Sequence, residues 1–447
     1  MTRANDVISL REATRTWFEI SLQTFGGPAG QIAVMQHKLV DEKRWIGQQR
    51  FLHALNYCML LPGPEAQQLA IYTGWLLNGS LGGLIAGVLF VLPGMLAMLA
   101  LSAVYVGAGD TSVVTGLFAG LAPAVIAIVV HAVGRVSGRA LHHPLLVAMA
   151  VASFAALTAF GVPFPLVILA AGVLGWLLRD LVGGSPPAHE VAGDVPAPLI
   201  SDEALHHDPP SSRRSLTILG LGLVLWFAPV AVVALVFSRD SVFVDQGLFF
   251  SGAAVVTFGG AYAVLAYVAQ QAVAVYGWLA PGEMVKGLAL AETTPGPLIM
   301  VVQFVAFVGA YRNPASLDPW LAAVLASLLV TWVTFVPCFL FIFLGAPYVE
   351  RLRSNVHLRA ALTGVTAAVV GVIANLAVFF ALHTLFETAS SLHWGPVDLE
   401  VPVLSSWDSL AFALTGVALA MVFWFRWSTL RVLGACAALG LGLTLLR

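Results

Sequence analysis

Charged side chains are scarce in this sequence, and their scarcity indicates the class of protein. Lys, Arg, Asp and Glu make up only 10% of the 447 residues, whereas 59% are hydrophobic and the mean hydropathy is +0.90. Such a chain has more apolar residues than a soluble core needs and too little polar surface to cover one. We therefore predict a multi-pass protein of the lipid bilayer. The net charge of −2 is too small to indicate a nucleic-acid partner.

Paired cysteines and fixed clusters of metal ligands are also missing. The chain has three cysteines, scattered through apolar stretches without paired spacing, which indicates neither a disulfide framework nor a zinc site: Cys58, Cys338 and Cys436. His189, His206 and His207 lie in a polar stretch without a fixed ligand geometry, which is more typical of a solvated linker than of a metal site. We expect neither a metal nor a cofactor.

Enzyme signatures are absent from the sequence. There is no His-Glu-x-x-His, no Gly-x-Ser-x-Gly and no phosphate-binding Gly-x-x-x-x-Gly-Lys. We therefore expect neither an enzyme nor an ATP-driven pump. The first 15 residues are polar and lack a short apolar core, so no removable signal peptide is expected.

Glycine and proline, in contrast, cluster inside apolar stretches that would otherwise be typical of membrane helices. Phe25-Gly26-Gly27-Pro28 is followed by Leu61-Pro62-Gly63-Pro64, and both patterns return as Phe258-Gly259-Gly260 and Thr294-Pro295-Gly296-Pro297. A helix cannot continue through such runs, because glycine adds backbone entropy and proline removes an N–H donor. The sequence predicts four broken helices.

The breaks recur at one spacing. Phe25 and Phe258 lie 233 positions apart, as do Pro62 and Pro295, and Trp45 matches Trp278 at the same spacing. Further along, Pro93 matches Pro337 and Gly120 matches Gly364 at a spacing of 244. These matches predict an internal duplication of at least four segments per half.

The predicted fold is all-α, with an N-terminal membrane repeat over residues 1–180, a flexible cytoplasmic linker over 181–215 and a C-terminal membrane repeat over 216–447. Residues 38–50 are basic, whereas their counterparts 271–283 contain neither lysine nor arginine. Because positive loops favour the cytoplasm, this contrast predicts that the second repeat is inverted. We expect nine full spans plus four broken segments, or 13 spans if all cross, with a cytoplasmic N-terminus.

Inverted repeats with discontinuous helices are typical of secondary transporters. A broken helix exposes backbone N–H groups and partial positive charge within the membrane, so an anion can bind there without a buried Lys or Arg. Close helix packing or simple kinks are the alternative use of Gly and Pro.

The linked motifs resemble those of the chromate ion transporter family. The residues that carry the resemblance are Phe25-Gly26-Gly27-Pro28 with Ile32-Ala33, Lys43-Arg44-Trp45, Leu61-Pro62-Gly63-Pro64-Glu65, Gln68-Leu69-Ala70 with Gly74, Phe90-Val91-Leu92-Pro93, Phe258-Gly259-Gly260-Ala261-Tyr262 and Thr294-Pro295-Gly296-Pro297. Because both halves match, the chain resembles the long, two-domain form. The resemblance implies a bacterial inner-membrane transporter that exports chromate, driven by the proton gradient, and gives chromate resistance.

Sulfate, a tetrahedral dianion of similar shape, is the competing substrate, and a passive anion channel is the other alternative. Whether the protein forms a homo-oligomer is left open. The predicted anion-binding residues surround the four breaks: Phe25, Gly26, Gly27, Pro28, Gln31, Pro62, Gly63, Pro64, Gln67, Phe258, Gly259, Gly260, Tyr262, Thr294, Pro295, Gly296 and Pro297.

Four ionisable residues near the breaks are further candidates. Glu65 and Glu292 are predicted to couple transport to protons, because a carboxylate inside the membrane is costly and usually functional. Capping of the following helix is the alternative for Glu65. His53 and Lys286, which are 233 positions apart, are candidates for a cationic path to the site, with snorkelling to the interface as the alternative.

Overall fold

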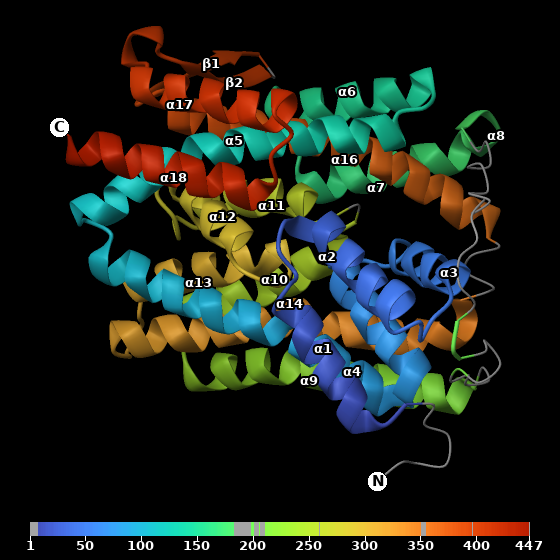
Figure 1. Cartoon of the computed structure of the whole chain (residues 1–447). Coiled ribbons are helices and arrows are strands. Elements are labelled where there is room, and N and C mark those ends of the chain that lie inside the picture. Colours follow the sequence, from blue (N-terminus) through green and yellow to red (C-terminus); the bar gives the residue numbers. More distant parts are fainter. Residues whose placement is uncertain are drawn as a thin grey trace. The chain divides into compact units, whose positions relative to one another are not determined.

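The computed structural model describes residues 8–182, 198–200, 205, 211–258, 260–349, 355–395 and 397–446, which are mostly helical (Figure 1). Five helical segments in this described part are long and apolar enough to cross a membrane: Glu65–Ala108, Ser112–Ala140, Ser212–Val236, Pro319–Tyr348 and Val356–Leu385. Several shorter apolar helices accompany them. The helical, multi-pass character predicted from composition is confirmed, and the number of spans stays a prediction.

The chain forms two compact units, and each draws segments from both halves of the sequence. Unit 1 comprises Met1–Leu99, Gly184–Ala261 and Thr294–Asn355. Unit 2 comprises Ala100–Gly183, Tyr262–Thr293 and Val356–Arg447. The repeats predicted for 1–180 and 216–447 follow the order of the chain, whereas the units combine pieces of both.

The described part of unit 1 contains short helices and three long ones. Its elements are α1 (Leu10–Ser21), α2 (Gly27–Gln36), the π-helix η1 (His37–Glu42), α3 (Gln48–Cys58), α4 (Glu65–Ala108) up to Leu99, α9 (Ser212–Val236), α10 (Val242–Val256), the 3₁₀-helix η4 (Leu298–Met300), α13 (Val301–Arg312), α14 (Pro319–Gly345) and the 3₁₀-helix η5 (Ala346–Tyr348). Side-chain N-caps mark the starts of α1 and α14. Ser9 accepts from the Glu12 amide, and Asp318 accepts from the amides of Trp320 and Leu321.

Helix α4 is not continuous. Asn78 (φ −137°, ψ 28°) and Gly79 (φ 60°, ψ −155°) leave helical geometry, and glycine is the residue that tolerates the second conformation. A Cβ at Gly74 would lie 2.6 Å from both the Gly82 carbonyl oxygen and the Ala86 Cβ, so the segments before and after the turn pack closely side by side.

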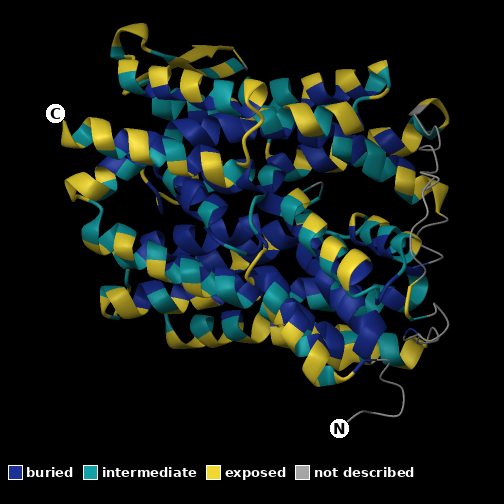
Figure 2. Cartoon of the chain, in the orientation of Figure 1, coloured by how far each residue is buried: buried dark blue, intermediate teal, exposed yellow. Residues whose placement is uncertain are grey.

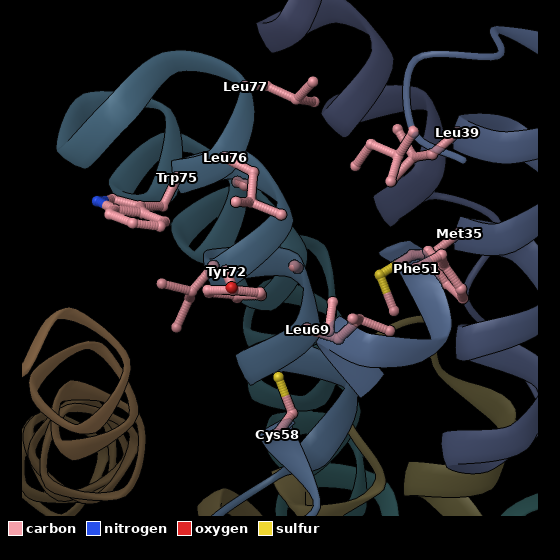
Figure 3. Close-up of a cluster of buried hydrophobic side chains, with 14 of the residues drawn as sticks. Met35, Leu39, Phe51, Cys58, Leu69, Tyr72, Trp75, Leu76 and Leu77 are labelled. Carbon is pink, nitrogen blue, oxygen red and sulfur yellow. The ribbon is translucent and has the colours of Figure 1, made fainter. Parts of the chain in front are cut away.

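The core of unit 1 is built on these short helices. Figure 3 shows buried side chains from α2, η1, α3 and α4 in one cluster, including Met35, Phe51 and Leu69, which are fully buried. Helical faces that lack partners in this unit remain exposed and apolar, most of all along α9 (Figure 2). Such faces are the ones that contact lipid in a membrane protein.

Unit 2 contains the remaining elements. They are the end of α4, α5 (Ser112–Ala140), α6 (Pro144–Thr158), α7 (Phe164–Leu177), α8 (Arg179–Val182), α11 (Ala261–Gln270), the π-helix η3 (Gln271–Val275), α12 (Glu283–Thr293), α16 (Val356–Leu385), β1 (Ala389–Trp394), β2 (Val397–Pro402), the 3₁₀-helix η6 (Leu404–Ser406), α17 (Ser409–Leu419), the π-helix η7 (Ala420–Trp424) and α18 (Thr429–Leu445).

Glycines allow close helix packing in unit 2. A Cβ at Gly120 of α5 would collide with the Cys436 carbonyl of α18, and one at Gly364 of α16 would collide with the Ala171 carbonyl of α7. Gly120 and Gly364 are the two glycines matched at a spacing of 244. Each of these glycines therefore brings its helix into backbone contact with a helix from the other half of the sequence.

The acidic stretch that contains Glu387, Asp398 and Glu400 differs from the predicted all-α fold. It includes an antiparallel hairpin in which Ala389 pairs with Pro402 and Trp394 pairs with Val397. Gly395 (φ 60°) lies in the turn. Apolar and polar residues alternate along Val397-Asp398-Leu399-Glu400-Val401, which is the period of a strand.

Local backbone geometry recurs at the spacing of 233. The Lys43 amide donates to the Lys38 carbonyl, and the Tyr276 amide donates to the Gln271 carbonyl, which closes a π-helical turn in each case. The residue after each turn has positive φ, 54° at Arg44 and 62° at Gly277. The matched sequences therefore adopt matched conformations.

Most of the predicted linker, including its three histidines, lies outside the described residues. Its described part contacts unit 1, where the Leu199 amide donates to the Arg44 carbonyl at 2.8 Å. Leu205 is buried.

Candidate functional site

The four predicted breaks are real interruptions of helix, and all four belong to unit 1. They precede α2, α4, α11 and η4, respectively. Their glycines have positive φ: 79° at Gly26, 73° at Gly27, 119° at Gly63, 101° at Gly260 and 97° at Gly296. Side chains rarely adopt these conformations, so each position favours glycine. Gly259 lies outside the described residues.

Hydrogen bonds join each break to a break of the other half. The Gly63 amide donates to the Thr257 carbonyl at 2.8 Å, and the Gly296 amide donates to the Thr24 carbonyl at 2.9 Å. Both pairs of equivalent residues, Thr24 with Thr257 and Gly63 with Gly296, are 233 positions apart. We call these two contacts the cross-braces. They satisfy amides that would otherwise be buried without a partner.

The cross-braces are not identical in their side chains. The Thr24 hydroxyl accepts a second contact from the Gly296 amide at 3.1 Å and donates to the Ser21 carbonyl at 2.9 Å. The Thr257 hydroxyl instead donates to Ala253 within its own helix. The two halves thus use the same backbone contact with different side-chain support.

Glutamines hold the backbone around the breaks. Gln31 donates to the Gly296 carbonyl at 2.5 Å and Gln68 donates to the Pro62 carbonyl at 2.6 Å. Gln67, in the first turn of α4, is fully buried, and neither of its amide atoms has a partner in the described chain. A buried amide without a partner is costly, and both amide atoms of Gln67 are available for further hydrogen bonds.

The space around the glycines separates them into two kinds. A Cβ at Gly26, Gly27 or Gly260 would meet nothing within 4 Å. At Gly63 it would lie 2.9 Å from both the Cys338 Sγ and the Gln68 Nε2. Open space therefore lies at the first break of each half, and tight packing lies at Gly63.

The remaining break residues flank these positions in unit 1: Phe25, Pro28, Pro62, Pro64, Phe258, Thr294, Pro295 and Pro297. Pro28 occupies the first turn of α2, where its missing N–H costs no hydrogen bond. Glu65 is the first residue of α4 and is partly buried. Within the described residues, no backbone amide donates a hydrogen bond to its carboxylate.

Three predicted residues belong to unit 2 instead. Tyr262 donates to the Glu292 Oε1 at 2.5 Å, and Glu292 is 3% exposed. The Lys286 ammonium lies over the rings of Tyr105 and Phe118. Its predicted companion His53 belongs to unit 1. Tyr262 is therefore bonded to a candidate coupling residue of its own unit.

The sequence-based prediction missed Thr24, Thr257 and Glu283. The two threonines carried a signal, because Thr-Phe-Gly-Gly is repeated in full at the spacing of 233. Glu283 had none, since its partner Tyr105 is 178 positions away.

A largely helical chain with apolar spans and paired helix breaks is a multi-pass membrane protein built around discontinuous helices. It matches the chromate transporter family over residues 11–176 and 244–441. The chain belongs to this family, which confirms the resemblance found in its motifs.

Three relatives are similar over most of their length. A chromate transport protein of Pseudomonas aeruginosa is 33% identical over 80% of this chain and 77% of its own. One of Cupriavidus metallidurans is 27% identical over 86% of both chains. A probable chromate transport protein of Synechococcus elongatus is 26% identical over 94% of this chain and 96% of its own. No solved structure matches the chain.

Proposed function

We propose that this protein is a secondary active transporter that exports chromate across the bacterial inner membrane, gives chromate resistance and is driven by the proton gradient. The observation that carries the proposal is the pair of cross-braces, in which Gly63 bonds to Thr257 and Gly296 bonds to Thr24. They support two homologous repeats whose discontinuous helices meet at one place, as in other secondary transporters.

The anion site is proposed at the starts of the broken helices. The amides of Gly63 and Gly296 are occupied by the cross-braces, so the donors are instead the backbone amides beside Gly26, Gly27 and Gly260, which all belong to unit 1. These helix starts carry partial positive charge and face open space. Gln67 supplies a side-chain donor.

Glu65 and Glu292 are the proposed coupling residues. A protonated Glu is neutral, and its ionisation opposes a nearby dianion, so the two occupancies are linked. Glu65 lies next to a break, and Glu292 is buried and bonded to Tyr262. His53 and Lys286 are the proposed cationic contacts along the path.

The proposed topology has inverted repeats with nine full spans, four re-entrant segments and a cytoplasmic N-terminus. It is supported by the basic loop over residues 38–50 and by the short broken helices, since an 11-residue helix such as α3 or α12 spans only about 16 Å.

The test is uptake of labelled chromate into inverted membrane vesicles with an imposed pH gradient. Vesicles of this orientation report export as accumulation. We expect accumulation that collapses when the proton gradient is dissipated, with sulfate added as a competitor. Flux that only equilibrates would assign a passive anion channel instead, and preferred accumulation of sulfate would assign a broader oxyanion carrier.

A further inference from the structure

Helix α12 of unit 2 begins with a buried acid. Glu283 is 6% exposed. Both of its carboxylate oxygens accept hydrogen bonds: Tyr105 Oη donates to Oε1 at 2.6 Å and the Ala280 amide donates to Oε2 at 2.7 Å. A buried carboxylate needs such donors in place of water.

Lys286 follows three residues later. Its Nζ lies 5.7 Å from the ring centroid of Tyr105 and 5.9 Å from that of Phe118. The two rings meet edge to face, with centroids 5.5 Å apart. The rings therefore hold the ammonium by cation–π attraction.

A carboxylate and an ammonium at positions i and i+3 of a helix are neighbours and normally attract each other. In the described ranges, Lys286 instead contacts the two rings, and no ion pair joins it to an acid there. Tyr105 keeps the charges apart, because its hydroxyl binds the acid and its ring face holds the base.

We propose that Tyr105 and Glu283 form a clamp that keeps Lys286 without a carboxylate partner, so that its ammonium binds the transported oxyanion. The proposal rests on the proposed function. An ammonium offers three donors to oxyanion oxygens, and a lysine already paired with Glu283 would bind the anion only by displacing that acid. Tyr105 and Glu283 are positioning residues, and Lys286 makes the contact.

The first test is Tyr105→Phe, which keeps the ring and removes the hydroxyl. Glu283 then loses a donor and pairs with Lys286, so we expect KM for chromate to rise about tenfold, the loss of one charge-assisted hydrogen bond, with Vmax little changed. Tyr348→Phe is the matched control, because it removes a tyrosine hydroxyl bonded to Ser215 in unit 1.

The double variant Tyr105→Phe/Glu283→Gln separates this mechanism from a structural defect. It removes the charge that captures Lys286, so KM should return towards that of the wild type. A double variant as impaired as Tyr105→Phe, or a Tyr105→Phe variant with an unchanged KM, overturns the clamp.

A second measurement needs no variant. The chain has three lysines, Lys38, Lys43 and Lys286, so acylation of each can be followed by mass spectrometry. Chromate should slow acylation of Lys286 and leave Lys38 and Lys43 unaffected, and equal rates with and without chromate overturn the contact. If wild-type vesicles do not accumulate chromate while Lys286 is protected, the proposed function fails and the anion contact of Lys286 stands.

Discussion

At the scale of residues, a substitution at Gly26 can distinguish two causes of lost transport, which are backbone strain and a side chain that fills the proposed anion site. Asn tolerates positive φ better than other side chains, and a side chain at Gly26 would enter open space. We expect Gly26→Asn to insert normally and lose most chromate transport. Gly161 is the matched control, because it also has positive φ (58°) and open space but lies between α6 and α7.

The control decides between the two explanations of this loss. Gly161→Asn should transport as the wild type does. If Gly26→Asn transports equally well, the open space at the first break does not hold the anion.

Glu65 permits a test of coupling at the same scale. Glutamine cannot release a proton, so Glu65→Gln should abolish accumulation driven by a pH gradient while leaving exchange of chromate between equal concentrations. Glu42→Gln, which alters an exposed acid paired with Lys38, serves as the control, since such pairs contribute at most about 1 kcal/mol. Accumulation by Glu65→Gln at the wild-type level would contradict the coupling role of Glu65.

At the scale of elements, close packing of α5 on α18 predicts a large effect of one methyl group. Gly120→Ala would place a Cβ against the Cys436 carbonyl, and we expect overpacking to lower the free energy of unfolding by about 1–3 kcal/mol. Thermal unfolding of the purified protein in detergent measures this. Gly134→Ala, in the same helix with nothing within 4 Å, should leave the unfolding temperature unchanged or raise it, and equal effects of both variants would contradict the packing argument.

At the scale of the whole molecule, both units need both halves of the chain. Unit 1 and unit 2 each contain segments from before and after the predicted linker. We therefore expect residues 1–190 and 191–447 to restore chromate transport when they are co-expressed, and neither to transport alone. Transport by a single half would show that a unit forms without its other segments.

The sequence predicted those features of the fold that depend on local chemistry. The breaks at Gly26, Gly63, Gly260 and Gly296 follow from glycine and proline themselves, and all have the positive φ that makes glycine necessary. The hairpin between Ala389 and Pro402 was missed, because a short alternating pattern among acidic residues is equally typical of a loop.

The partners of these residues could not be predicted in the same way. Gly63 bonds to Thr257 and Glu283 bonds to Tyr105, and such contacts arise from tertiary packing that no local pattern specifies. The spacing of 233 pointed to equivalence of Gly63 with Gly296, but not to the exchange of their hydrogen bonds between halves.

The cross-braces also set an order of events during biosynthesis. When Gly63 and Thr24 leave the ribosome, their partners Thr257 and Gly296 have not been made. At about 5–20 residues per second, the segments that contain these partners are synthesised roughly 10–50 s later. The first half must therefore wait in the translocon or in the bilayer with these two groups unpaired, and both cross-braces can form only after residue 296 of 447 has been made.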